Sequence, residues 1–300
     1  KKKKDYHLVV VSSTVMPETV GRVARYILEE KSGKKCGIDF GVVYNPEFIA
    51  LGSVIKDFLN PDLILIGELS KRDGDALEEV YNRVCDNSPY FARMSTVNAE
   101  ITKISLNCYI TTKITFANSL AGLCEMVQGA NAHVISDALG HDSRIGIKYI
   151  KPGLGYGGPC FPRDNLAFAA FARKISSQAK LAEAVDEVNR DQPERVLRKI
   201  QGIIIKLNKQ KKFKIGILGL SYKPNTPIVD ESQALRIAQL LINEGFSLAV
   251  HDPQAQDNVR GVLGDSVEYM EKAEDCISLV DLVVIAVPWQ EFSKIDFPKI

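Results

Sequence analysis

Short apolar runs alternate with helical patterns over the first hundred residues of the chain. Four runs read as strands: 6–11, 41–44, 63–67 and the weaker 92–97. The first of them is expected to be buried. Apolar positions at helical spacing separate them, over 20–30 and again over 75–84. This alternation predicts a parallel α/β sheet.

The pattern turns helical from Ala99 to about Leu207, interrupted by a glycine-rich segment at 151–164. A new unit begins near residue 211, where a buried strand, an amphipathic helix and a second strand ending at Asp252 follow one another. This β-α-β order is typical of nucleotide-binding folds. Its first turn has glycines but lacks the full GxGxxG spacing, so a cofactor turn and a structural turn stay equally open.

We therefore expect an α/β protein with two Rossmann-like domains joined by a helical central domain. The expected bounds are 1–98, 99–210 and 211–300, with the charged run 209–212 marking the last boundary. More apolar surface lies on the long central helices than one subunit would cover, which predicts a homodimer.

Composition narrows the class of protein. Hydrophobic residues make up 45% of the 300 residues, enough to build cores, and the net charge is only +1. Nucleic-acid binding is not expected from that charge, and Lys1–Lys4 reads as a solvated chain end. No apolar stretch is long enough to predict a membrane span. Six scattered cysteines without CxxC pairs argue against zinc or a disulfide scaffold, and favour a reducing, cytoplasmic setting.

The segment 152–164, PGLGYGGPCFPRD, carries the densest candidate chemistry. Its glycines would let backbone N–H groups approach a phosphate or sugar closely. Cys160 ends the loop, Arg163 would favour a thiolate, and Asp164 would orient a water. A tight loop with an incidental cysteine is the equally weighted alternative.

Three further groups of polar residues carry weaker signals. Lys103 and Asn107 share a helix face with Glu100 nearby and would stabilise an oxyanion, although a solvated helix face is the simpler interpretation. Glu47 follows a strand end within 45–48, as either a functional or a capping acid. The run 12–14, which ends in Thr14, resembles a helix cap.

Taken together, these segments resemble the UDP-glucose/GDP-mannose dehydrogenase family. The matching stretches are SSTV (12–15), NPEF to LILIG (45–67), AEITKISLN (99–107), DSRIGIKYIKPGLGYGGPCFPRD (142–164) and GILGLSYKPNT to ES (216–232). They occur in the family's order over nearly the whole chain. The GGPCFPRD loop combined with AExxKxxxN is the most specific part, and the UDP-glucose branch is the most similar.

The resemblance implies an NAD-dependent, four-electron oxidation of a nucleotide sugar's C6 alcohol to a carboxylate. Cys160 is implied as the nucleophile, through a thiohemiacetal and a thioester, with Lys103 and Asn107 stabilising the oxyanion. Asp164 and Thr14 would hold the catalytic water, and Glu47 would assist hydrolysis. Thr14, Glu47 and Cys160 are also implied to contact NAD.

Substrate contacts are implied at a further set of positions. These are Tyr149, Lys151, Gly153, Gly155, Tyr156, Gly157, Phe161, Tyr222 and Lys223, with Arg144 reaching the sugar site of a partner subunit. No metal is implied. UDP-glucose is the first choice of sugar, and UDP-N-acetylmannosamine and GDP-mannose stay open.

Three departures from the family pattern stand out. Leu51 replaces a second glutamate, and Asp230 replaces an arginine that meets the cofactor's phosphates. The segment before residue 6 has no GxGxxG turn, so the first domain is expected to be incomplete, and NAD binding to be weak or absent. Two alternatives therefore remain: a nucleotide-sugar-binding fragment without catalysis, and a two-electron dehydrogenase that does not use Cys160.

Overall fold

The computed structural model describes residues 5–207 and 213–296 in two compact units. One unit comprises Lys1–Asn107 with Ala167–Gln178, and the other comprises Cys108–Leu166 with Ala179–Ile300. Lys1–Lys4 and the predicted boundary run 209–212 lie outside the described residues. Within the described ranges, no helix is long and apolar enough to cross a membrane.

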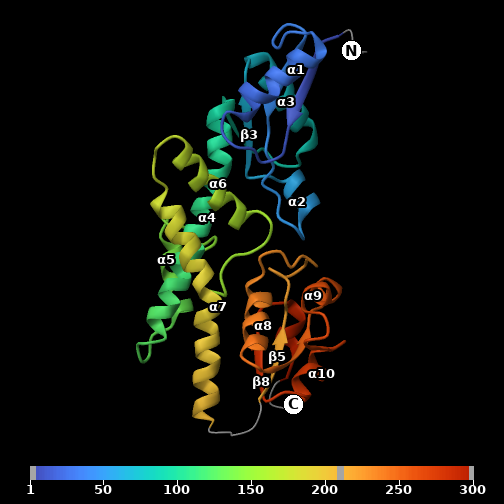
Figure 1. Ribbon diagram of the computed structural model, residues 1–300. Coiled ribbons are helices and arrows are strands. Elements are labelled where there is room, and N and C mark those ends of the chain that lie inside the picture. Colours follow the sequence, from blue (N-terminus) through green and yellow to red (C-terminus); the bar gives the residue numbers. More distant parts are fainter. Residues whose placement is uncertain (1–4, 208–212, 297–300) are drawn as a thin grey trace. The chain divides into compact units, whose positions relative to one another are not determined.

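A four-stranded sheet in the order β1-β2-β3-β4 forms the first unit (Figure 1). Its strands are β1 (His7–Val11), β2 (Phe40–Tyr44), β3 (Leu63–Glu68) and β4 (Tyr90–Ser95). Its helices are the π-helix η1 (Thr19–Ala24), α1 (Arg25–Ser32), α2 (Val54–Leu59), α3 (Lys71–Val84) and the first part of α4 (Thr96–Cys124). The predicted strands are thus confirmed in place to within about two residues.

The prediction of a fully parallel sheet is wrong at its centre. β1 pairs with β2 and β3 with β4 in parallel, but β2 and β3 run antiparallel and overlap only at Val43–Tyr44 and Gly67–Glu68. The reason lies in α2, which buries no residue and so does not return the chain across the sheet as a crossover helix would. The overlap joins the carboxyl ends of β2 and β3.

β1 also differs from its prediction as a buried strand. None of its residues is fully buried, whereas all five residues of β2 are. β1 is the edge strand of the described sheet, with β2 on one side. An apolar run alone does not distinguish an edge strand from a central one.

Helices cover both faces of this sheet. Val20 of η1 and Ala99 of α4 pack with Val42 and Leu65 on one face, and Leu77 of α3 packs with the strands on the other. Gly67 lies where α4 crosses the strands, because an added Cβ would come within 2.8 Å of the Ala99 Cβ and 3.0 Å of the Thr96 Cα. A glycine is therefore required for α4 to begin at this point.

The second unit combines long helices with a parallel sheet in the order β7-β6-β5-β8 (Figure 1). Its strands are β5 (Lys214–Leu218), β6 (Ser247–His251), β7 (Glu268–Tyr269) and β8 (Leu282–Ile285). Its helices are the rest of α4, α5 (Ala132–His141), the start of α6 (Phe161–Lys174), α7 (Lys180–Lys206), α8 (Gln233–Asn243), α9 (Gln256–Leu263), α10 (Ala273–Ser278) and the 3₁₀-helix η2 (Gln290–Lys294). All four strands run parallel, which confirms the β-α-β interpretation.

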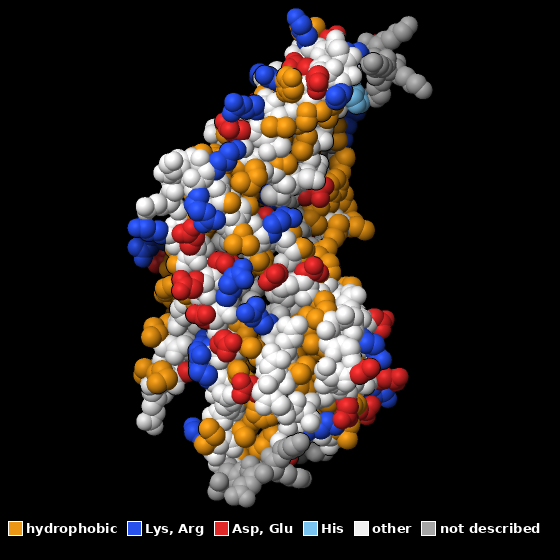
Figure 2. All heavy atoms as spheres, in the orientation of Figure 1, with side chains coloured by type: hydrophobic (Ala, Val, Ile, Leu, Met, Phe, Trp, Pro, Cys, Tyr) orange, Lys and Arg blue, Asp and Glu red, His pale blue; other side chains and the backbone are white. Residues whose placement is uncertain are grey.

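Two apolar layers hold this sheet. Leu197 of α7, Ile237 of α8 and Val259 of α9 pack on one face with β5 and β6. On the other face, Cys276 of α10 packs with Trp289 near η2. Lys and Arg side chains are interspersed with Asp and Glu on the surface shown in Figure 2, in keeping with the net charge of +1.

Arg93 of β4 binds three carboxylates in the first unit. Its guanidinium lies 2.6 Å from Glu68, 2.5 Å from Asp75 and 2.9 Å from Glu78, and its side chain is only 21% exposed. These ion pairs raise the pKa of Arg93 well above its ordinary value, against the opposing effect of burial. The network joins β3 and β4 to α3.

We predict that Arg93→Met lowers the free energy of unfolding by about 1–3 kcal/mol, because it leaves three neighbouring carboxylates without their cation. Urea denaturation followed by far-UV circular dichroism measures the change. Lys71→Met is the matched control, since the Lys71–Asp75 pair is exposed and contributes less than about 1 kcal/mol. Equal effects of the two substitutions would contradict this role for Arg93.

Candidate functional site

Two candidate segments of the first unit follow neighbouring parallel strands. Thr14 follows β1 and Glu47 follows β2, so both lie at the same edge of this strand pair. Asn45 fixes the edge: its N–H donates to the Val11 carbonyl (2.9 Å) and its side-chain amide donates to the Leu65 carbonyl (2.9 Å). Thr14 is half-buried and Glu47 is exposed, as groups that meet a ligand need to be.

The face of α4 that carries Lys103 and Asn107 is buried within the protein. Their exposed fractions are 8% and 7%, and Glu100, at the same helical face, is fully buried. The interpretation of this face as an ordinary solvated surface is therefore wrong. Burying three polar groups costs free energy unless each is hydrogen-bonded. Their burial on one helix face therefore indicates a role other than contact with solvent.

Lys103 links α4 to the segment after β2. Its Nζ donates to the Glu47 carbonyl (2.6 Å) and lies 4.3 Å from the centre of the Phe48 ring. A hydrogen bond and a cation–π contact thus hold a mostly desolvated ammonium in one place. A preorganised cation of this kind can stabilise a developing negative charge.

Most of the glycines of the loop in the second unit meet protein rather than open space. A Cβ on Gly155 would lie 2.5 Å from the Asn189 side chain, one on Gly157 would lie 2.3 Å from the Glu231 carbonyl, and one on Gly158 would lie 2.6 Å from the Tyr222 ring. Gly155 and Gly158 also have positive φ values, +116° and +80°. Close packing against the chain accounts for these three glycines. Gly153 alone of the four has nothing within 4 Å, so the expected open cradle is confined to it.

Asn189 and Gln233 hold the middle of this loop and were not singled out from the sequence. Asn189 accepts from the Tyr156 N–H (2.8 Å) and donates to the Tyr156 carbonyl (3.0 Å), to which Gln233 also donates (2.9 Å). Asn189 is a buried polar residue among apolar ones on α7. A polar residue on the apolar face of a predicted helix is the signal in the sequence that could have identified it. Tyr156 is thereby fixed with its ring edge-on to that of Phe161.

Asp230 contributes its backbone rather than its side chain to the same loop. Its carbonyl accepts from the Gly158 N–H (2.9 Å), and the side chain is exposed. Any residue at position 230 would supply this carbonyl. The hydrogen bond to Gly158 therefore does not depend on whether an aspartate or an arginine stands there. Leu51, the other departure, is 38% exposed in the first unit, and no contact explains it.

Cys160 is the exposed cysteine of the six. Cys108 and Cys276 are buried, and Cys36, Cys85 and Cys124 are half-buried. Burial raises the pKa of Cys108 to about 12, with the Asp164 charge adding to the effect, and raises that of Cys276 to about 11. Those thiols stay protonated near neutral pH, whereas Cys160 is accessible and directly precedes α6, at the positive end of the helix dipole.

Asp164 lies in the first turn of α6 and is fully buried. Its carboxylate accepts from Arg163 (3.0 Å), its N–H donates to the Cys160 carbonyl (2.9 Å), and its own carbonyl lies 3.7 Å from the Cys108 sulfur. Asn165 adds hydrogen bonds to Thr111 of α4. The turn that carries the thiol and the acid is therefore anchored to α4.

The predicted substrate contacts fall into two sets in the second unit. Gly157, Tyr222 and Phe161 belong to one cluster around Tyr156 and Gly158, with the Lys223 ammonium 5.6 Å from the centre of the Tyr222 ring. Burial raises the pKa of Tyr222, and the nearby Cys160 adds to the rise.

The second set is exposed. Tyr149 adopts a left-handed backbone (φ 67°), uncommon for a non-glycine residue, and Lys151 is also exposed. Arg144 forms a two-point ion pair with Asp142 at 2.9 and 2.6 Å and is 86% exposed.

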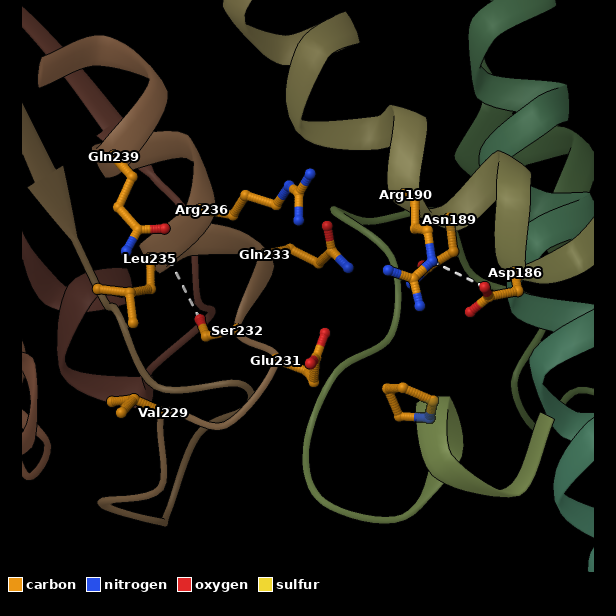
Figure 3. Close-up of a pocket in the computed structure, with 11 residues that line it drawn as sticks. Asp186, Asn189, Arg190, Val229, Glu231, Ser232, Gln233, Leu235, Arg236 and Gln239 are labelled. Atoms are coloured by element: carbon orange, nitrogen blue, oxygen red, sulfur yellow. Dashed lines mark hydrogen bonds and ion pairs between the residues drawn. The ribbon is translucent and has the colours of Figure 1, made fainter. Parts of the chain in front are cut away.

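A cavity of about 210 Å³ lies beside the clustered set. In Figure 3, Asp186, Asn189 and Arg190 of α7 face Gln233, Arg236 and Gln239 of α8 across it. Arg190 is paired with Asp186 (2.7 Å). A larger cavity of about 460 Å³ has Gly153 in its wall, with Glu125, Arg195 and Lys199 forming ion pairs at its edge.

The glycine turn after β5 is structural. Gly219 has φ +85°, and a Cβ there would lie 2.6 Å from Val287. Asp252, at the end of β6, where a cofactor-binding acid would lie, accepts four backbone N–H groups, two of them from Leu220 and Ser221. Its oxygens are committed to the chain, which disfavours a dinucleotide site at this turn. Within the described ranges, no group of three His, Cys, Asp or Glu residues is arranged to hold a metal.

We predict that Gly158→Ala lowers the free energy of unfolding of the second unit by about 1–3 kcal/mol, because the methyl group meets the Tyr222 ring in a left-handed backbone. Gly153→Ala is the matched control and should change it by less than about 1 kcal/mol. Urea unfolding followed by the fluorescence of Trp289, the chain's single tryptophan, reports on this unit. Indistinguishable midpoints would refute the packing role.

We also predict that iodoacetamide at pH 8 alkylates Cys160 well before Cys108 or Cys276. A pKa of about 12 leaves a thiolate fraction of about 10⁻⁴ at Cys108, and burial blocks the reagent. Peptide mass spectrometry over a time course measures the order of labelling. Modification of Cys108 in the folded protein ahead of Cys160 would be the contrary result.

Comparison with known proteins matches three parts of the chain to one family. Residues 1–85, 97–191 and 216–300 match the NAD binding, central and UDP binding domains of the UDP-glucose/GDP-mannose dehydrogenase family. A UDP-glucose 6-dehydrogenase of Haloferax volcanii is 34% identical over 98% of this chain and 68% of its own length. One of Rickettsia bellii is 33% identical over 98% of this chain and 66% of its own length. The chain thus spans about two thirds of these relatives.

Solved structures agree with this assignment. A UDP-glucose dehydrogenase from Pyrobaculum islandicum superposes with a TM-score of 0.88 at 38% identity, covering 98% of this chain and 66% of its own. A UDP-D-ManNAc dehydrogenase from Pyrococcus horikoshii shares the fold, with a TM-score of 0.83 at 23% identity over 97% of this chain and 65% of its own. The sequence matches and the fold agree, and the chain belongs to the UDP-glucose/GDP-mannose dehydrogenase family.

Proposed function

We propose that the protein oxidises the C6 alcohol of UDP-glucose to the carboxylate of UDP-glucuronate, with NAD as the hydride acceptor. The observation that carries this proposal is Cys160, an accessible thiol on a glycine-packed loop, one helical turn before the buried acid Asp164. The choice of sugar rests on relatives of 33–34% identity and a solved structure of 38% identity, all named as UDP-glucose dehydrogenases.

The proposed reaction has four steps: a first oxidation, addition of the thiol, a second oxidation and hydrolysis. Loss of the hydroxyl proton and a hydride from C6 gives an aldehyde, to which the Cys160 thiol adds to form a thiohemiacetal. Loss of a second proton and hydride gives a thioester, and water then releases the acid and restores the thiol. Covalent capture by sulfur divides a difficult oxidation into easier steps.

Lys103 and Asn107 are proposed to stabilise the oxyanions of these intermediates. Both lie on the buried face of α4, where an ammonium and an amide act with little competition from water. Hydrogen bonding of Lys103 to the Glu47 carbonyl keeps the cation in place before substrate arrives.

Water for the last step is assigned to Thr14 and Asp164, with Glu47 assisting hydrolysis. The buried carboxylate of Asp164 can accept a proton or orient a water. Glu47 is exposed at a strand end and acts without the second acid that Leu51 replaces.

The nucleotide sugar is assigned to the loop and its partners. Tyr156, Phe161 and Tyr222 are clustered by packing, while Tyr149, Lys151 and Lys223 offer a phenol and two ammonium groups for sugar and phosphate oxygens.

A homodimer through α4 is part of the proposal, with Arg144 reaching the partner's sugar. Tyr109, Phe116 and Leu123 are 64%, 55% and 68% exposed at seven-residue spacing, an apolar stripe suited to a second helix. The free thiol that the scheme needs favours a reducing compartment such as the cytoplasm.

The residues present fit one side of an NAD site. The shared edge after β1 and β2 is where α/β folds place a cofactor, and Thr14 and Glu47 are accessible there. Thr14, Glu47 and Cys160 would contact the bound cofactor, which supplies the hydride acceptor.

UDP-N-acetylmannosamine and GDP-mannose are the alternative substrates, and a non-catalytic nucleotide-sugar-binding fragment is the alternative function. A panel of the three nucleotide sugars, with NADH formation and binding measured separately, distinguishes them. Binding without NADH from any sugar would favour the non-catalytic alternative.

We predict that Cys160→Ser lowers NADH formation from UDP-glucose by at least about 10³-fold, because the aldehyde is no longer captured. Cys85→Ser is the matched control: this half-buried thiol at the end of α3 lies outside the assigned machinery. Steady-state absorbance at 340 nm measures both variants. Full turnover by the Cys160 variant would show a two-electron dehydrogenase without a covalent step.

A further inference from the structure

Glu100 is a fully buried carboxylate that the scheme above leaves without a role. Each of its oxygens accepts a short hydrogen bond from the backbone of another element. The Glu18 N–H donates to Oε2 (2.6 Å) and the Val20 N–H donates to Oε1 (2.6 Å). Such a carboxylate costs free energy to desolvate, and these two charge-assisted bonds offset that cost.

The two donors begin the π-helix η1. Glu18 has a left-handed backbone (φ 73°), and its own side chain makes no capping bond to η1. The first N–H groups of a helix have no partner inside it and need an outside acceptor. Glu100 supplies that acceptor from α4, so the start of η1 is held by a residue about eighty positions away in the sequence.

The segment 12–17, which carries Thr14, is held at both ends. At one end the Val11 carbonyl accepts from the Asn45 N–H (2.9 Å), and at the other Glu100 holds Glu18 and Val20. Removing the Glu100 carboxylate takes away both hydrogen bonds at the Glu18 end, where packing of Val15 against the core remains.

Glu100 and Lys103 lie one turn apart on α4. Glu100 binds the start of η1 after β1, and Lys103 binds the Glu47 carbonyl after β2. One rigid helix face therefore sets the positions of both segments that follow the strand pair.

We propose that Glu100 is a positioning residue for the reaction: its carboxylate, acting through the N–H groups of Glu18 and Val20, fixes the segment 12–17 and thereby the Thr14 hydroxyl relative to Lys103. The catalytic half of this inference rests on the proposed function. Burial raises the pKa of Glu100 and the two N–H bonds oppose the rise. An amide in place of the carboxylate would point a donor at one of the two N–H groups.

The test compares Glu100→Gln with Asp73→Asn. Asp73 is also a fully buried carboxylate of the first unit, but it binds Tyr6 (2.5 Å) and Ser70 (2.7 Å), outside the assigned machinery. Hydrogen exchange of the 18 and 20 amides, read by NMR, reports anchoring whether or not the protein is active. Turnover of UDP-glucose reports positioning.

For Glu100→Gln we expect exchange at those two amides to rise at least about tenfold. We expect kcat to fall about 10–100-fold and KM for UDP-glucose to stay within about twofold. Asp73→Asn should change neither these amides nor kcat. Glu100→Gln should lower kcat much less in the Thr14→Val background than in the wild-type protein, because both substitutions act through the Thr14 hydroxyl. Glu100→Asp, which keeps the charge, should be intermediate and serves if the amide variant does not fold.

Unchanged exchange at residues 18 and 20 would overturn the anchoring. Faster exchange with unchanged kcat, or fully additive effects with Thr14→Val, would overturn the positioning role alone. A wild-type protein that turns over no nucleotide sugar at saturating NAD would refute the proposed function and the catalytic half with it, while the exchange measurement would still decide the anchoring.

Discussion

The buried polar face of α4 is the constraint on which the rest of the structure depends. Polar groups removed from water need hydrogen-bond partners, and several of the partners here belong to segments that carry candidate chemistry. In the first unit Lys103 binds the Glu47 carbonyl, and in the second Thr111 binds Asn165 beside Asp164. Further along, Asn118 accepts from the Gly153 N–H (2.7 Å). A helix that was apolar on this face would deprive those segments of these hydrogen bonds.

Packing against glycines fixes the position of the cysteine loop, residues 152–164. Gly155, Gly157 and Gly158 let the chain lie directly on Asn189, Glu231 and Tyr222. The loop is held by its own unit, which leaves Cys160 exposed at the start of a helix anchored through Asn165. For the nucleophile proposed at Cys160, a backbone fixed in this way would need little rearrangement when substrate binds.

Most elements were predictable from the sequence because their apolar periodicity is strong, and the resemblance identified the candidate residues. The wrong predictions have one cause in common: the pattern of apolar and polar residues along the chain does not show which elements pack against a given residue. The orientation of β3 depended on α2 staying off the sheet, and the exposure of β1 depended on its place at the edge. Spacing favoured a solvated face for Lys103, although the neighbouring Ile101 and Ile104 indicated a helix that is apolar on several sides. Asn189 became visible only through its bonds to Tyr156.

The proposed function requires that one protein takes the sugar through both oxidation steps. The direct measurement is the end-point ratio of NADH formed to UDP-glucose consumed, with the product identified by mass spectrometry. We expect two NADH per sugar and UDP-glucuronate as the product, because the thioester on Cys160 is reached only after the second hydride leaves. One NADH per sugar with an aldehyde as the end product would contradict a four-electron oxidation.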